Sequence, residues 1–78
     1  MTDLNIAGIR RLAKKGGAER ITREALEYLL FALEALTIEI SKQAKAFAEL
    51  NGRKTINIRE IKHALKELGL LGIIEEKS

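Results

Sequence analysis

Apolar side chains recur at helical spacing in three segments of the chain, and short polar stretches separate these segments. In the first segment, Ile6 and Ile9 begin a pattern that predicts a short amphipathic helix over residues 6–15. Asn5 suits the N-cap of this helix, because its side-chain oxygen can accept a backbone N–H of the first turn. Gly16 and Gly17 suit its end, because glycine readily adopts the left-handed backbone that closes helices.

The second segment is much longer. It contains neither Pro nor Gly between Thr22, a suitable N-cap, and Leu50, so it predicts one helix of about 28 residues and roughly 42 Å. Two apolar stripes run along this helix. The first comprises Leu26, Leu29, Leu30, Leu33, Leu36, Ile40, Ala44 and Phe47, and the second comprises Tyr28, Phe31, Ala35 and Ile38. Two short flanking helices can cover one stripe, so the other is expected to pack against a second copy of the chain.

The third segment follows Gly52, which is expected to end the long helix. Asn57 and, three positions later, Glu60 form a capping-box pattern that predicts the start of a third helix, which Gly69 closes. Residues 69–78 follow as an extension that is apolar first and then acidic. The expected fold class is therefore all-α, with a short helix, a loop, a long helix, a loop and a short helix.

Charge is unevenly distributed over the 78 residues, whose formal net charge is +3 and whose pI is near 9.5. Residues 1–23 hold six basic side chains against two acidic ones, and residues 51–66 hold five against one. The long helix between them is acidic overall. A fold that brings the two basic blocks together would form a surface suited to a polyanion such as double-stranded DNA.

Several classes of function have no support in the sequence. It has no Cys and one His, so neither a disulfide nor a metal site is expected, and no cofactor. No acid–base pair and no phosphate-binding Gly-rich loop point to an enzyme or a small-molecule substrate. The longest apolar run, residues 29–33, is too short to span a bilayer, and the N-terminus lacks a signal-peptide pattern. The expectation is a cytoplasmic protein without a membrane partner.

Two short motifs add a resemblance to a known family. "GAERI" at residues 17–21 and "GRKTI" at residues 52–56 stand on either side of the long helix. On a short–long–short helical frame they resemble the minimal, tail-less histones of archaea and some bacteria, over roughly residues 5–68. The resemblance implies a histone-fold domain over residues 1–68 and an intertwined, head-to-tail homodimer. It also implies a histone-like protein that compacts or organises chromosomal DNA in the nucleoid, largely independently of base sequence.

The same resemblance assigns roles to individual residues. In such a dimer, Arg20-Ile21 of one chain would pair with Thr55-Ile56 of the other in a short β-bridge, with basic side chains facing DNA phosphates. Arg20 would enter the minor groove. Arg53 and Glu60 would form a structural ion pair, with Glu60 where the family more usually has Asp. The DNA-binding residues implied are Arg11, Lys14, Lys15, Arg20, Lys54 and Thr55.

The C-terminal extension predicts a further contact between copies. Four large apolar side chains within five positions would form an exposed patch, and Leu50 stands where the family typically places the His that stacks dimers. We therefore expect a tetramer that bridges two duplexes. The residues expected at oligomer interfaces are Leu50, His63, Leu70, Leu71, Ile73 and Ile74. Two alternatives stay open: the extension covers its own dimer, or the chain is a histone-fold interaction subunit of a transcription or assembly complex.

Overall fold

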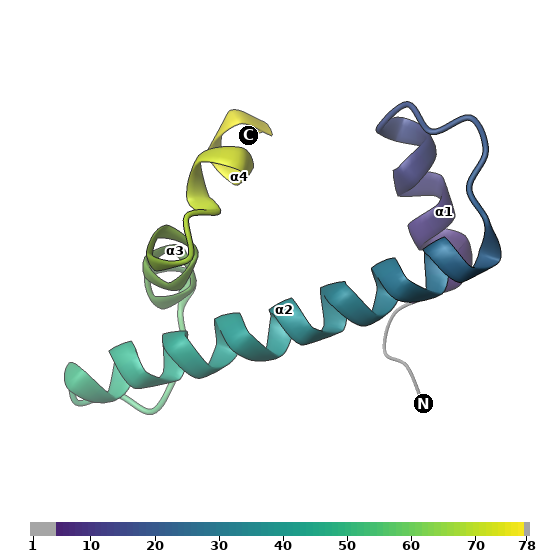
Figure 1. Cartoon of the computed structure of the whole chain (residues 1–78). Helices are drawn as coiled ribbons and strands as arrows, with labels where there is room; N and C mark the ends of the chain where they lie inside the picture. Colours follow the sequence, from purple (N-terminus) through teal and green to yellow (C-terminus); the bar gives the residue numbers. More distant parts are fainter. Residues whose placement is uncertain (1–4, 78) are drawn as a thin grey trace. The chain divides into compact units, whose positions relative to one another are not determined.

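The computed structural model describes residues 5–77, with side chains described as far as Glu75, and all regular structure in that range is helical (Figure 1). The helices in chain order are α1 (Ile6–Lys15), α2 (Arg23–Leu50), α3 (Ile58–Glu67) and α4 (Leu71–Lys77). The all-α expectation is confirmed, and the first three helices lie within a residue or so of their predicted bounds. The chain divides into two compact units within α2, after Leu36.

The first unit contains α1 and the first half of α2, held together by aliphatic side chains. Ile9, Leu26 and Leu30 form its buried cluster, and Ile6 and Ile21 pack against them, as does Leu33. Leu26 is completely buried, and burying a leucine side chain contributes about 1.5–3 kcal/mol relative to leaving it in water. The core of this unit is therefore a conventional aliphatic contact between two helices.

Side-chain caps begin both helices of the first unit, as the sequence predicted. Asn5 Oδ1 accepts the backbone N–H of Gly8 at 3.2 Å, and Thr22 Oγ1 accepts that of Ala25 at 3.1 Å. Between the helices Gly17 has a φ of +99°, a left-handed conformation that favours glycine. The chain therefore turns at this glycine, and residues 18–22 lead into α2.

The second unit contains the other half of α2 together with α3 and α4. Small side chains form its buried apolar positions: Ala44 and Ala48 on α2, and Ala64 on α3. The ring of Phe47 stacks on that of His63, with centroids 3.8 Å apart and planes inclined by 11°. Small residues leave little apolar area to bury, so the second unit depends more than the first on this ring contact and on polar contacts.

The C-terminal extension is a helix of its own, which the sequence did not predict. α3 ends at Glu67, and Gly69 has a φ of +75°, so the chain turns before α4. The backbone N–H of Leu70 donates to the carbonyl of Leu65 at 2.8 Å, and α4 contacts α3. Ile73 and Ile74 on α4 remain exposed.

The two stripes of α2 differ from expectation in one respect. Tyr28 and Phe31 of the second stripe are 73% and 63% exposed, which agrees with a surface that the chain's own helices leave uncovered. However, Leu29 and Leu36 of the first stripe are also exposed. At about 100° per residue, Leu29 lies roughly 60° from Leu26 around the helix. The flanking helices therefore cover the first stripe only in part: Leu26, Leu30 and Ala44 are buried, whereas Leu29 and Leu36 are not.

Candidate nucleic-acid interface

The second loop, residues 51–57, leaves α2 by a sharp turn. The amide of Asn51 donates from Nδ2 to the carbonyl of Phe47 at 2.9 Å, and the backbone N–H of Arg53 donates to the carbonyl of Ala48 at 2.9 Å. Gly52 between them has a φ of +71°, which a side chain would strain. These contacts close the end of the helix and fix the direction in which the basic stretch begins.

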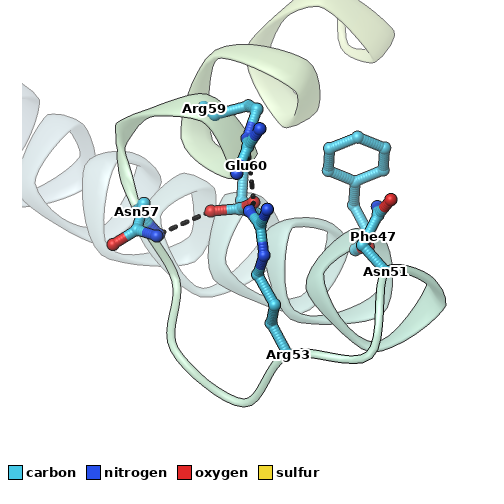
Figure 2. A network of polar contacts seen from close by, with 6 residues as sticks. All are labelled: Phe47, Asn51, Arg53, Asn57, Arg59 and Glu60. Atoms are coloured by element: carbon cyan, nitrogen blue, oxygen red, sulfur yellow. Dashed lines mark hydrogen bonds and ion pairs between the residues drawn. The ribbon is translucent and has the colours of Figure 1, made fainter.

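A single buried carboxylate connects this loop to α3. Glu60 has no exposed surface, and its two oxygens serve different partners. Oε1 accepts the backbone N–H of Asn57 at 2.7 Å, which is the capping-box bond expected from the sequence. Oε2 accepts from Arg53 Nη1 at 3.2 Å and lies 3.6 Å from Arg59 Nε. Figure 2 shows Arg53 reaching the carboxylate from the loop and Arg59 reaching it from α3.

The environment of Glu60 keeps it ionised. The backbone N–H of Asn57 is the main reason why the pKa of the Glu60 carboxyl lies below its ordinary value of 4.5. The backbone N–H of Glu60 and the guanidinium of Arg53 lower this pKa further, whereas burial opposes them. Hydrogen bonds to a carboxylate favour its charged form, which explains the direction. At neutral pH the Glu60 cluster, which comprises Arg53, Arg59 and Glu60, therefore contains one buried anion and two guanidinium cations.

Lys54 and Thr55, the predicted phosphate-binding pair, are both exposed in this loop. They stand between Arg53, whose side chain is tied to Glu60, and Asn57, whose backbone is tied to the same carboxylate. A cation and a hydroxyl on a loop fixed at both sides can contact a phosphate with little further ordering. The predicted Arg53–Glu60 ion pair is thus present, and it supports the loop that carries Lys54 and Thr55.

The first loop, residues 16–22, presents Arg20 to solvent. The next residue, Ile21, is half-buried against the aliphatic cluster, and Thr22 caps α2. Arg20 therefore emerges directly before two anchored residues. The remaining predicted DNA-binding residues of this unit, which are Arg11, Lys14 and Lys15, are all exposed on α1. Lys14 and Lys15 lie in the last turn of α1, where cations also favour the helix dipole.

The structure places the predicted site residues in two sets, one in each unit. Arg11, Lys14, Lys15 and Arg20 belong to the first unit, and Arg53, Lys54, Thr55 and Glu60 belong to the second. Sequence reasoning missed Arg59, which joins the Glu60 cluster. Its only sequence signal is its position directly before Glu60 in the first turn of α3. Adjacent residues of a helix do not normally face each other, so this position alone does not predict a contact between them.

The residues expected at oligomer interfaces have different surroundings. Leu50 is 85% exposed at the end of α2. His63 stacks on Phe47, and its Nε2 lies 3.8 Å from Glu67 Oε1. Leu70 and Leu71 are half-buried, whereas Ile73 and Ile74 are exposed on α4. His63 therefore has a packing role within the second unit that the sequence did not reveal.

Two other kinds of site are absent from the part of the chain that the structure describes. No group of three or more His, Cys, Asp or Glu side chains in it is arranged to hold a metal ion. Among its helices, none combines the length and the apolar character needed to cross a bilayer.

Helices in the order short, long and short, with an exposed basic side chain in the loop on each side of the long one, define the class of histone-fold proteins. Comparison with known proteins agrees. The family profile described as "Histone-like transcription factor (CBF/NF-Y) and archaeal histone" matches residues 2–65. The chain belongs to this family, and at that level it is a histone-like DNA-binding protein.

Curated relatives cover nearly the whole histone-fold part of the chain. One subunit of the archaeal histone HAN1 from Thermococcus zilligii is 42% identical over 66 residues, which is 85% of this chain and 98% of the relative. The probable archaeal histone 3 of Methanocaldococcus jannaschii is 35% identical over the same shares of each chain. Histone H4 of Dictyostelium discoideum is 33% identical over 61 residues, which is 78% of this chain and 56% of the relative.

Proposed function

We propose that this protein compacts or organises chromosomal DNA as a homodimer that contacts phosphates and the minor groove largely independently of base sequence. The observation that carries the proposal is the second loop, where exposed Lys54 and Thr55 stand on a backbone tied to buried Glu60. Phosphate contacts require charge, hydroxyl groups and backbone N–H donors but no base-specific geometry. Membership of the archaeal histone family supports the same function.

A homodimer would complete the interface. Exposed Tyr28, Phe31 and Leu36 on α2 support pairing with a second copy, because such side chains are costly to leave in water. In the head-to-tail arrangement, Arg20 of one chain would lie beside Lys54 and Thr55 of its partner. Each end of the dimer would then combine a groove-inserting arginine with a phosphate-binding loop, which suits association with the nucleoid.

Salt dependence tests this proposal directly. If a dimer neutralises about 6 phosphates, log affinity should fall against log salt with a slope near −5. Titration of several unrelated duplexes at a series of salt concentrations measures both the slope and any sequence preference. Affinity that is insensitive to salt, or orders of magnitude higher for one sequence, contradicts the proposal.

The extension over residues 69–78 is proposed to join two dimers into a tetramer that bridges duplexes. The family match ends at residue 65, so α4 lies beyond it. Exposed Ile73 and Ile74, together with exposed Leu50, offer apolar surface for such a contact. A chain ending at Leu68 should sediment as a dimer, keep α1 to α3 and still bind one duplex. A full-length protein that remains a dimer at high concentration rules this role out, and α4 then only covers its own dimer.

A second function is worth testing because the family description also names histone-like transcription factors and one relative is named as a histone subunit. On this alternative the chain pairs with a different histone-fold chain in a transcription or assembly complex. The mass of the single purified chain in solution separates the two functions. A stable homodimer that binds duplex DNA favours the first, and a monomer without duplex binding favours the second.

A further inference from the structure

Arg59 contacts buried Glu60 from α3, and the function proposed above gives it no role. It lies in the first turn of α3, and its side chain is 62% exposed. Its Nε atom is 3.6 Å from Glu60 Oε2, which is an ionic contact. Among the described residues, the side chain of Arg59 has no hydrogen-bond partner. One edge of its guanidinium group is therefore held near the carboxylate while most of the side chain faces solvent.

Glu60 does not need Arg59 to be satisfied. Its Oε1 already accepts the backbone N–H of Asn57 at 2.7 Å, and its Oε2 already accepts from Arg53 at 3.2 Å. Buried carboxylates are stable when such hydrogen bonds and one opposite charge are present. Two guanidinium groups, those of Arg53 and Arg59, thus face one carboxylate, and the exposed Lys54 stands on the adjoining loop, so positive charge remains in excess.

We infer that Arg59 is a further phosphate-binding residue, which grips a DNA phosphate with its Nη groups while Glu60 orients its Nε edge. A guanidinium carries five N–H donors in a planar fork that matches two phosphate oxygens. Anchoring one edge at Glu60 restricts the side chain before binding, so less conformational entropy is lost on contact. Lys54 supplies a point charge from the loop, whereas Arg59 supplies directional hydrogen bonds from the first turn of α3.

This inference rests on the proposed DNA binding and is tested with the full-length chain. Arg59→Gln removes the charge, and Lys42→Gln is the matched control, because Lys42 is an exposed cation on α2 outside the loop. Each lost phosphate contact reduces the steepness of the salt slope by about 0.9, or about 1.8 for the two copies of a homodimer. At 0.1 M salt the affinity should fall roughly tenfold per copy. Lys42→Gln should leave both quantities near those of the unaltered protein.

A second variant keeps the test valid if Arg59→Gln loses helicity. Arg59→Lys retains the charge but not the fork, so it should keep the salt slope while binding duplex several-fold more weakly. Thermal melting by circular dichroism accompanies each titration. Equal slopes for Arg59→Gln and Lys42→Gln overturn the inference, as does an Arg59→Lys variant that binds as tightly as the unaltered protein. Absence of duplex binding by the unaltered protein removes the proposed function as well.

Discussion

The loops before and after α2 are held in place by different physical means. In the first loop, Ile21 is anchored in an aliphatic cluster and Thr22 caps the following helix with a neutral hydroxyl. In the second loop, the anchor is the buried carboxylate of Glu60, which ties Arg53 and the backbone of Asn57 together. One loop is thus supported by packing, and the other by a charge that must stay ionised.

The difference follows from the side chains available in each unit. The first unit buries leucine and isoleucine, whereas the second buries mainly alanine besides Glu60. Alanine contributes little apolar area, so polar contacts contribute a larger share of the stability of the second unit than of the first. The first unit should therefore respond to loss of side-chain volume, and the second to loss of charge and to acid. Substitutions in each unit test this contrast.

The largest effect is expected from Leu26→Ala in the first unit. Leu26 is completely buried, and such a change costs about 2–5 kcal/mol because transfer free energy is lost and a cavity remains. Chemical denaturation at fixed protein concentration measures it, since a dimer's stability depends on concentration. Leu12→Ala at an exposed position of α1 is the control and should change stability by about 0.5 kcal/mol or less. Equal effects would mean that this cluster is not the core of the unit.

Glu60→Gln should give the next largest effect, and this effect should depend on pH. The pKa of Glu60 is lowered in the folded protein. Its ionised form therefore contributes stability that is fully present above the unfolded-state pKa, near 4.5. That contribution is lost as pH falls below this value and through the folded-state pKa. The melting temperature of Glu60→Gln should be clearly lower at pH 7, and the gap to the unaltered protein should narrow below pH 4.5.

An exposed carboxylate provides the comparison for this pH series. The Oε2 atom of Glu49 lies 4.0 Å from Lys45 Nζ, and both side chains are mostly exposed. Glu49→Gln should therefore have nearly the same melting temperature as the unaltered protein at every pH of the series. If the difference in melting temperature between Glu60→Gln and the unaltered protein stays constant from pH 7 to pH 3, ionisation of Glu60 does not support the second loop.

Thr22→Ala should have a smaller effect, on the first loop. Removing the hydroxyl leaves the backbone N–H of Ala25 without its cap, which costs about 1 kcal/mol. Thr22→Ser keeps the hydroxyl and should recover most of the loss. Unlike the effect at Glu60, the loss should be the same at pH 7 and pH 4, because no titrating group takes part. Denaturant midpoints at the two pH values measure it.

The smallest effects on stability are expected from Arg20→Ala and Lys54→Ala. Both side chains are exposed, and surface changes of this kind usually alter stability by about 0.5 kcal/mol or less. Each should nevertheless weaken duplex binding and make its salt dependence less steep. Melting and duplex titration are measured on the same preparations. A variant that loses helicity would be structural, and its assignment to the interface would have to be withdrawn.

Local signals in the sequence were enough to locate the first three helices. Asn5 and Thr22 cap their helices as predicted, and glycines stand at the turns that follow. Such signals act over a few residues, which is why they can be read without the rest of the fold. α4 was missed because Gly72 interrupts a short apolar stretch that has no capping pattern, so only its contact with α3 distinguishes it from a tail.

The helical frame, the two basic blocks and the capping relation between Asn57 and Glu60 could all be predicted from the sequence, because each depends on residue identity and spacing alone. The packing of the helices was needed to show that Glu60 is completely buried and shared by two arginines, and that His63 stacks on Phe47. These facts depend on how α3 packs against the second half of α2. Spacing along one helix gives the face a side chain occupies, but burial and shared partners arise only when another helix covers that face.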